Sequence, residues 1–395
     1  MITFSSFFNL INTFFGISVA SFNRNGNYFV KSTFKRIYTT VLLLITILFY
    51  PKMIKFFVNN FYDISKNPLS MLVCLLQTSS QYVLNVTLLL SKLIYCREEV
   101  TFKNNHLKFK KKLNDYILKN KKTKSGQNLL YFYFLINSVF IFLMQIYATT
   151  VVLVRVVRFH ALGYIYIITY VFSYFQIITV GNMFFEKILQ YYFAVSYINQ
   201  ALLDDLRILL GKIGCKSRSH CIISSCGISD NLDNLQRLNS QLYELVYEMI
   251  QYESLALIAV FLHKFIEILV PIFYQFIART LYVDSSSNLS IYIVFGMCYP
   301  LWNVISMFLL INMCEKFQQE MATTGKILHE FPIHKVDDRL KESISQFSIQ
   351  ILQEKRPISL CGMFNVDNTL LYSMISSMTS YLILLIQFQL QGIGL

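Results

Sequence analysis

Long apolar segments alternate with short polar ones along the whole chain. A helix needs roughly 20 mainly apolar residues to cross the hydrocarbon core of a bilayer. Seven segments reach that length, and they are residues 36–58, 68–95, 128–154, 162–188, 252–279, 289–314 and 366–390. The pattern therefore predicts an all-α, polytopic membrane protein with seven transmembrane helices.

Three of these predicted spans continue as helices past the length of a bilayer. Residues 189–211, 232–251 and 315–331 keep an apolar periodicity while they gain Asp, Glu, Arg and Gln, which is typical of helices that extend into water. A further amphipathic helix is predicted over Asp337 to Gln353. The first 20 residues have no basic segment ahead of their apolar stretch, so they predict a short amphipathic helix at the interface rather than a signal peptide.

Composition and charge agree with a membrane protein and orient it. The chain is 55% hydrophobic and only 14% charged, whereas soluble domains carry about 25% charged residues, so a soluble enzyme is excluded. Of the 35 Lys and Arg residues, 27 fall on one side of the predicted spans and 6 on the other. Basic residues mark the cytoplasmic side, which predicts a cytoplasmic N-terminus and an extracellular C-terminus. The lysines between Lys103 and Lys124 are interpreted as a solvated loop in preference to a site for anionic lipid.

The last predicted span has a narrow polar face. At 100 degrees per residue, one side of the helix collects Thr369, Ser373, Ser376, Ser377, Ser380, Gln387 and Gln391. Small polar residues are typical of helix packing inside a membrane bundle. The same stripe repeated around a symmetry axis would line an aqueous pore, with Leu384 as a dewetting constriction and Gln387 as a polar ring. The pattern by itself leaves both interpretations open.

The C-terminal fifty residues carry a motif. From Phe347 the chain reads FSIQILQEKRPISLCGMFNVDNTLLYSMISSMTSYLILLIQFQL. Ser380 and Tyr381 precede five hydrophobic residues, which Gln387 and Phe388 follow. The segment resembles the C-terminal signature of insect gustatory receptors, in which Thr-Tyr, five hydrophobic residues and Gln-Phe occur in that order. Ser380 replaces the Thr and keeps its hydroxyl group.

The resemblance implies a tastant-gated, non-selective cation channel in the dendritic plasma membrane of chemosensory neurons. It implies a homotetramer, or a heteromer with other gustatory receptors, in which the last span lines the pore. Gln387 and Phe388 then lie at the gate and Tyr381 packs the helix against its neighbour, whereas the gate role of Leu384 comes from the helical wheel. Sugar receptors commonly carry Glu where this chain has Leu382, so a bitter-type or orphan ligand is favoured, with the fructose-type branch left open.

The resemblance also implies a division of the chain into membrane and cytoplasmic parts. The expected parts are a cytoplasmic N-terminal segment (1–35), transmembrane helices one to four (36–188), helix extensions of an anchor domain (189–251), transmembrane helices five and six (252–314), cytoplasmic anchor helices (315–362) and the pore helix (363–395). The anchor domain would hold the subunits together, and ligand would enter an outward-facing pocket among the earlier spans.

Candidate ligand-binding residues are polar or aromatic groups in the spans, because small-molecule pockets combine aromatic walls with a few polar groups. In the outer halves of the spans they are Gln77, Gln81, Gln145, Thr149, Tyr166, Tyr170, Trp302 and Asn303. Lys264 and Glu267 lie near the middle of the fifth span beside His263. Ionisable residues at this depth are functional candidates, but at a spacing of three they could also neutralise each other.

Other classes of function have less support in the sequence. A G-protein-coupled receptor would have an external N-terminus and Asp-Arg-Tyr and Asn-Pro-x-x-Tyr motifs, which the chain lacks; a metabotropic seven-helix receptor or a small-molecule transporter remains the alternative. No His-Glu-x-x-His, phosphate loop or nucleophile motif occurs, so we expect no enzyme, no catalytic residue and no metal or cofactor site. The expected partners are a tastant, the lipid bilayer and permeating cations, and not nucleic acid.

Overall fold

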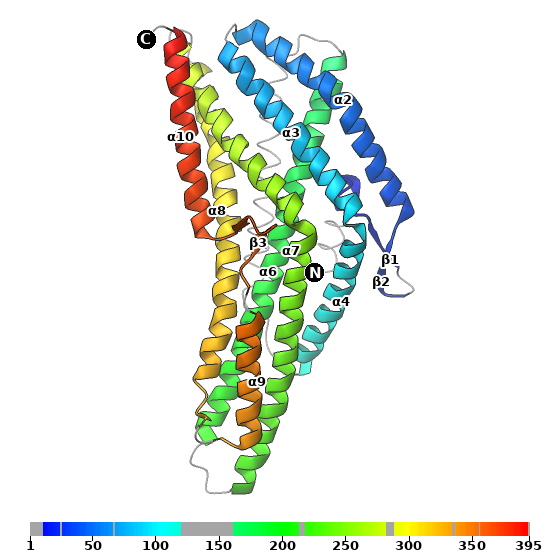
Figure 1. The fold of residues 1–395 in the computed structure, drawn as a ribbon, viewed down its shortest axis with the longest axis vertical. Coiled ribbons are helices and arrows are strands. Elements are labelled where there is room, and N and C mark those ends of the chain that lie inside the picture. The colour runs from blue at the N-terminus through cyan, green and yellow to red at the C-terminus, as the bar shows by residue number, and fades with distance from the viewer. Residues whose placement is uncertain are drawn as a thin grey trace.

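The computed structural model describes residues 11–23, 26–65, 68–119, 161–212, 218–281, 288–333, 336–354 and 356–393. These residues form an elongated bundle of long helices with two short β-hairpins (Figure 1). The helices are α2 (Thr33–Ser65), α3 (Pro68–Ile94), α4 (Cys96–Lys119), α6 (Ala161–Lys212), α7 (Arg218–Leu281), α8 (Asn288–His329), α9 (Asp338–Glu354) and α10 (Asn368–Ile393). The antiparallel hairpins are β1 (Ala20–Asn23) with β2 (Tyr28–Lys31), and β3 (Ser359–Leu360) with β4 (Phe364–Asn365).

Six of the described helices are long and apolar enough to cross a membrane, namely α2, α3, α6, α7, α8 and α10. They correspond to six of the seven predicted spans, and the predicted span at 128–154 lies outside the described residues. Helices α2, α7 and α8 continue through Pro51, Pro271 and Pro300, respectively. Proline is tolerated in membrane helices because neighbouring groups satisfy the freed backbone carbonyl.

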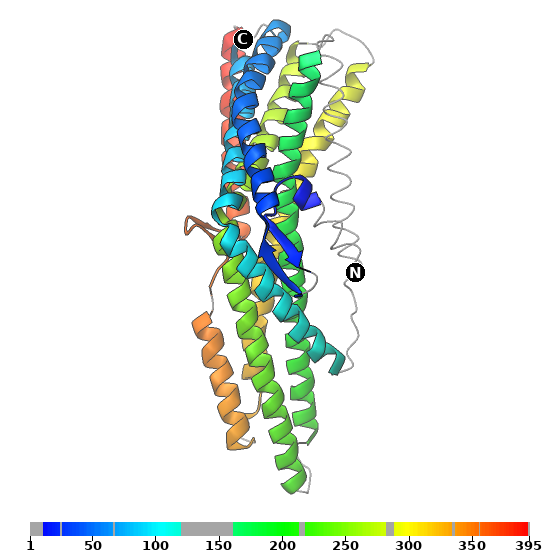
Figure 2. The same ribbon diagram turned by 90° about the vertical axis from the view of Figure 1, so that its right-hand side faces the viewer.

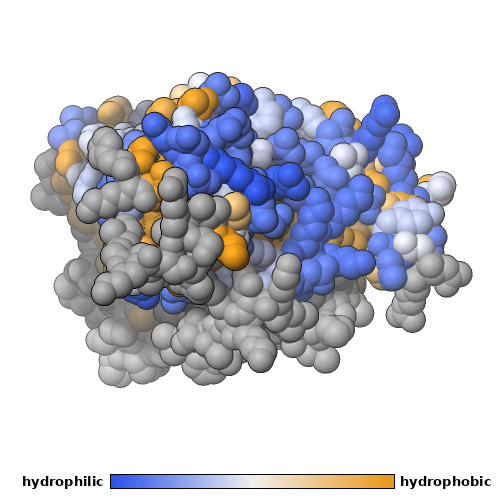
Figure 3. All heavy atoms as spheres, turned by 90° about the horizontal axis from the view of Figure 1, so that it is seen from below, coloured by the Kyte–Doolittle hydropathy of each residue, from blue (hydrophilic) through white to orange (hydrophobic). Residues whose placement is uncertain are grey.

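Helices α6, α7 and α8 are much longer than a bilayer is thick, and they continue through the segments whose apolar periodicity predicted helix extensions. They contain 52, 64 and 42 residues, so at 1.5 Å per residue they are roughly 60 to 95 Å long, against about 30 Å for a hydrocarbon core. The extended ends pack with α9 at the end of the molecule opposite the C-terminus (Figures 1 and 2). Seen from that end, the described surface is mostly hydrophilic (Figure 3). Helix α9 coincides with the predicted amphipathic helix to within one residue.

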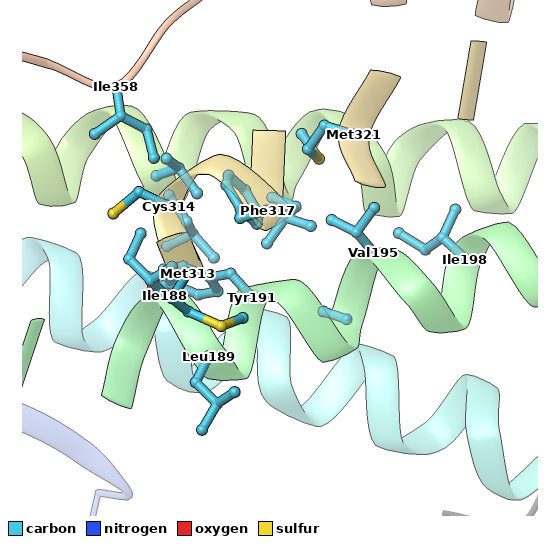
Figure 4. Close-up of a cluster of buried hydrophobic side chains, with 14 of the residues drawn as sticks. Ile188, Leu189, Tyr191, Val195, Ile198, Met313, Cys314, Phe317, Met321 and Ile358 are labelled. Atoms are coloured by element: carbon cyan, nitrogen blue, oxygen red, sulfur yellow. The ribbon is translucent and has the colours of Figure 1, made fainter. Parts of the chain in front are cut away.

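One continuous apolar core joins the spans to their extensions. Buried side chains of α6 and α8, including Ile188, Val195, Met313 and Phe317, interleave along the axis of the bundle (Figure 4). Ile358, just before β3, joins the same core, so the segment that leads into α10 is packed against the extensions. A displacement of this core would therefore also displace the segment that leads into α10.

The basic segment after α3 is a helix, and the prediction of a solvated loop there was wrong. Helix α4 buries Phe102, Phe109 and Ile117, which lie seven and eight residues apart and hence on one helical face. Lys108 and Lys111 are exposed on the other side. The amphipathic pattern is hard to recognise in the sequence because its buried residues occur only about once in two helical turns, among many lysines.

The segment before α2 is hydrogen-bonded to the buried Glu99 carboxylate of α4. Its described part begins with a short helical turn at residues 11–14, but the β1–β2 hairpin that follows was not predicted. Glu99 accepts hydrogen bonds from the Ser18 hydroxyl (2.9 Å), the Val19 backbone N–H (3.2 Å) and the Lys103 ammonium (2.6 Å). The amide side chain of Asn104 also exchanges two hydrogen bonds with the backbone of Phe29. These contacts hold the hairpin against α4, next to the N-terminus of α2.

We expect Glu99→Gln to loosen the β1–β2 hairpin. The substitution removes the charge that pairs with Lys103, and breaking a buried pair costs about 3 kcal/mol. Amide hydrogen exchange in residues 18–31 should therefore accelerate on the order of 100-fold, measured by mass spectrometry on the detergent-solubilised protein.

The neighbouring Glu98→Gln, at an exposed site, is the control and should change nothing. Burial raises the pKa of Glu99, but the charge and hydrogen bond of Lys103 outweigh it and lower the pKa to about 2 from the usual 4.5. Docking is thus fully stabilised above pH 4.5 and weakens only as the pH falls from 4.5 toward 2. Equal exchange in wild type and Glu99→Gln would contradict this role for Glu99.

Candidate functional site

Helix α10 begins at a defined turn and cap. Met363 N–H donates to the Leu360 carbonyl (2.9 Å) across Cys361 and Gly362, which have φ values of 49° and 69°, as the two central residues of a type I′ turn require. The Asp367 carboxylate then accepts hydrogen bonds from the backbone N–H groups of Thr369 and Leu370 (2.9 and 3.2 Å), which is an N-cap. The Cys-Gly-Met-Phe element of the sequence motif is therefore the hairpin that starts the helix.

The polar stripe of α10 points away from the rest of its own chain. Ser373, Ser376, Ser377, Ser380 and Gln387 are all exposed, and so are Leu384 (46%) and Phe388 (55%). The hydroxyl groups of Ser373 and Ser380 donate to carbonyl oxygens of the same helix (2.8 and 3.1 Å). No other described helix covers this face, so packing among the described helices does not explain the stripe.

The opposite side of α10 packs on the bundle. Leu371 and Met378 are buried, and Leu382 and Leu385 lie against the apolar core around α7. The signature residue Tyr381 lies at the border between the two faces. It is 56% exposed and meets the ring of Phe265 on α7 edge to face at 6.1 Å.

A second cluster of polar residues is buried between α3, α6, α7 and α8. The Glu267 carboxylate accepts hydrogen bonds from the Tyr299 hydroxyl (2.5 Å) and the Gln77 amide (3.1 Å). The hydroxyl groups of Tyr299 and Tyr174 are 2.5 Å apart. Glu267 is 3% exposed, so neutral donors from two other helices stabilise a carboxyl group inside the membrane segment.

Lys264 has a different set of partners on α8. Its ammonium donates to the Asn303 side-chain oxygen (2.6 Å) and to the Ser306 hydroxyl (3.0 Å). Of the two interpretations that the sequence left open, the local pair between Lys264 and Glu267 is not formed. No ion pair within 4.0 Å joins these two described residues, because each side chain reaches a neighbouring helix. Their charges instead tie α7 to α3 and to α8.

The other predicted ligand-binding residues fall around this cluster. The Gln81 amide donates to the Tyr170 carbonyl (3.2 Å), which links α3 to α6. Trp302 packs against the buried pair Tyr174 and Ile178, and Tyr166 meets the Phe56 ring at 5.2 Å. Gln145 and Thr149 lie outside the described residues.

Tyr174, Tyr299 and Ser306 belong to the cluster, although sequence reasoning did not select them. Tyr174 follows Tyr170 by four residues and Tyr299 precedes Asn303 by four, so each shares a helical face with a predicted residue. That spacing was the available signal. The number of tyrosines, 26 in the chain, concealed it.

The cluster is equipped for binding and for holding helices together. Over the described part of the chain, no group of three or more His, Cys, Asp or Glu side chains could hold a metal ion. Hydroxyl, amide and charged groups instead meet aromatic walls, which is the composition of a small-molecule site. The fold and this arrangement define a polytopic all-helical membrane protein with a buried polar site and an exposed polar helix face.

Comparison with known families agrees with that class. The family model described as 7tm Chemosensory receptor matches residues 2–392, so the chain belongs to the 7tm chemosensory receptor family. This is a family of membrane receptors and not of enzymes. The chain is accordingly a multi-pass membrane protein.

Similar proteins include gustatory receptors of Drosophila melanogaster. Gustatory receptor 10a is 27% identical over 172 residues, which is 43% of this chain and 40% of that protein. Gustatory receptor for bitter taste 66a is 37% identical over 81 residues, covering 20% and 15% of the two chains. The aligned segments thus cover less than half of each relative's length.

The fold is also found in a solved structure. The insect olfactory receptor OR5 from Machilis hrabei superposes with a TM-score of 0.64 at 15% sequence identity, over 98% of both chains. A structure of that receptor in complex with eugenol gives a TM-score of 0.62. The two proteins therefore share the same overall fold.

We expect Tyr299→Phe to destabilise the protein. The change removes a donor to the buried Glu267 carboxylate while keeping the ring, and the loss of such a hydrogen bond costs about 2 kcal/mol. The measurement is the melting temperature of the detergent-solubilised protein. Tyr372→Phe, at a site that is 71% exposed, is the matched control. A melting temperature equal to the control's would show that Glu267 does not depend on Tyr299.

Proposed function

We propose that the protein is a gustatory receptor that works as a tastant-gated, non-selective cation channel in the plasma membrane of sensory dendrites. In this proposal four subunits surround one pore, and α10 of each subunit lines it. The N-terminus is cytoplasmic, and the extensions of α6, α7 and α8 form an anchor domain with α9. The observation that carries the proposal is the exposed polar face of α10.

The position of that face argues for water beside it. Polar side chains in contact with lipid are costly, and within membranes they face a bundle interior or a water-filled cavity. The serine stripe is exposed in the single subunit, and Gln387 has no hydrogen-bond partner in the described residues. A ring of four such helices would give Gln387 an aqueous environment and place Leu384 and Phe388 at a narrow constriction.

Exposed apolar residues support an assembly of several subunits. Leu352 and Ile349 on α9 are 74% and 51% exposed, although α9 belongs to the hydrophilic end of the molecule. Isolated surface apolar residues are normal, but neighbouring ones on a helix that should be in water favour a contact surface. This surface suits the subunit contacts of an anchor domain.

The buried cluster around Glu267 and Lys264 is the best-supported region for ligand recognition. Tyr174, Tyr299 and Trp302 supply aromatic surface, and the two ionisable groups supply directional hydrogen bonds. Binding there could shift α7, whose Phe265 touches Tyr381 of the pore helix. A bitter-type or orphan ligand is favoured over a sugar because Leu382 replaces the usual Glu, and two relatives are named as receptors for bitter taste.

Gln387→Glu should change ion permeation. Four added carboxylates at the pore would concentrate cations and raise calcium permeability severalfold relative to sodium, because rings of acidic side chains select cations. The measurement is the shift in reversal potential of ligand-evoked currents in cells that express the receptor, alone or with gustatory co-receptors.

Gln346→Glu is the matched control, since it makes the same change at an exposed site on α9, and it should leave the reversal potential unchanged. A ligand response that persists with an unaltered reversal potential in Gln387→Glu, and that requires a G protein or a substrate gradient, would instead indicate a metabotropic receptor or a transporter.

Leu352→Asp should weaken the assembly. A charge in an apolar contact between anchor domains is desolvated without a partner, which costs several kcal/mol per subunit pair. Purified wild-type protein should have the mass of four subunits, and Leu352→Asp should shift it toward smaller species in mass photometry. Gln353→Asp, at the adjacent exposed position, should stay tetrameric; a monomeric wild type would contradict the assembly.

A further inference from the structure

A small cavity lies between α6, α7 and α8, beside the Lys264 cluster. Its volume is about 30 Å³. Apolar side chains such as Val260, Phe261 and Met307 form much of its wall. The polar residues that line it are Asn182, His263, Lys264 and Ser306. Glu267 does not line this cavity. Its hydrogen bonds go to Gln77 on α3 and to Tyr299 on α8.

Two polar groups at this cavity lack a full set of partners. His263 is 2% exposed, and its Nε2 atom has no hydrogen-bond partner in the described part of the protein. The ring of His263 is held by an edge-to-face contact with Tyr174 at 5.1 Å. The Lys264 ammonium has three N–H groups, and two of them reach Asn303 and Ser306. In the tautomer that carries its proton on Nδ1, His263 offers an acceptor at Nε2. Lys264 offers a donor for which the described residues supply no third partner, and both residues line the cavity.

The size and charge of the cavity restrict what can occupy it. A cavity needs roughly 10 to 15 Å³ of this kind of volume for one water molecule, so about 30 Å³ holds one or two and is too small for a tastant. Lys264 and Glu267 form no ion pair, but Glu267 lies one helical turn away, so the two opposite charges still attract each other in a medium of low dielectric constant. A neutral occupant that both donates and accepts hydrogen bonds fits the available groups.

We propose that this cavity is a resident water site inside the membrane-spanning bundle. One water molecule accepts a hydrogen bond from Lys264 Nζ and donates one to His263 Nε2. Buried water is retained where it satisfies otherwise unpaired polar groups. The water completes the hydrogen bonding of the ammonium group and joins His263 to the network that connects α7 with α8.

A water molecule at this site also explains why Gly181 and His263 occur beside the cavity. Gly181 lines the cavity from α6, and a Cβ atom there would lie 3.1 Å from Val260 Cγ1. The missing side chain lets α6 approach α7 closely while the cavity remains open. The described residues supply no partner for Nε2 of this buried histidine, and a water molecule would explain its presence where packing alone does not.

The test is a cryo-electron microscopy map of the full chain in lipid nanodiscs, at a resolution that resolves ordered water. Wild type should show a compact peak within about 3 Å of both Lys264 Nζ and His263 Nε2, the length of a hydrogen bond. His263→Phe keeps a ring against Tyr174 but removes the acceptor, so the peak should be lost. His263→Gln restores a polar partner and should regain it.

Two results would overturn the proposal. One is an empty wild-type cavity in a map that shows other buried waters. The other is elongated density, which would make the cavity part of the ligand pocket. If His263→Phe does not fold, the proposal is tested by the wild-type map together with a map of Ser306→Ala. This variant keeps both Lys264 and His263, so the water peak should be retained. None of these outcomes depends on whether the protein conducts ions.

Discussion

The structure depends on one constraint, which is that a polar side chain inside a membrane must have a hydrogen-bonding partner or water. Glu267 meets it through Tyr299 and Gln77, and Lys264 meets it through Asn303 and Ser306. These bonds determine which faces of α3, α7 and α8 come together. On the polar face of α10, Ser373 and Ser380 bond only to carbonyl groups of their own helix, and Gln387 has no partner among the described residues. This difference separates the buried cluster from the proposed pore.

Helix α7 connects the two regions. It carries Lys264 and Glu267 on the side of the buried cluster, and Phe265 between them meets Tyr381 of α10. Farther along, Phe261 meets Phe364 of the β3–β4 hairpin with ring centroids 6.4 Å apart. A displacement of α7 would thus reach both the start and the middle of α10. Interfaces of packed side chains transmit such displacements because their arrangement is discrete.

Much of this fold follows from the sequence because lipid imposes a simple pattern. Apolar length located the spans, and polar periodicity located the extensions and α9. Helix α4 was missed because its apolar stripe of Phe102, Phe109 and Ile117 is sparse among lysines. The sequence left a Lys264–Glu267 pair open because spacing along one helix does not reveal partners on another. The helical wheel of α10 identified a polar face, but only the packed structure shows that no other described helix covers it.

The most direct test of the central claim is the accessibility of that face to water during channel activity. In Ser380→Cys, a charged thiol reagent applied to cells should alter ligand-evoked current, and ligand should change the rate of modification. Ile375→Cys, on the opposite flank of α10, and the unmodified receptor should be unaffected. A pore-lining α10 predicts this contrast; a Ser380→Cys receptor that responds normally to ligand and ignores the reagent would contradict it.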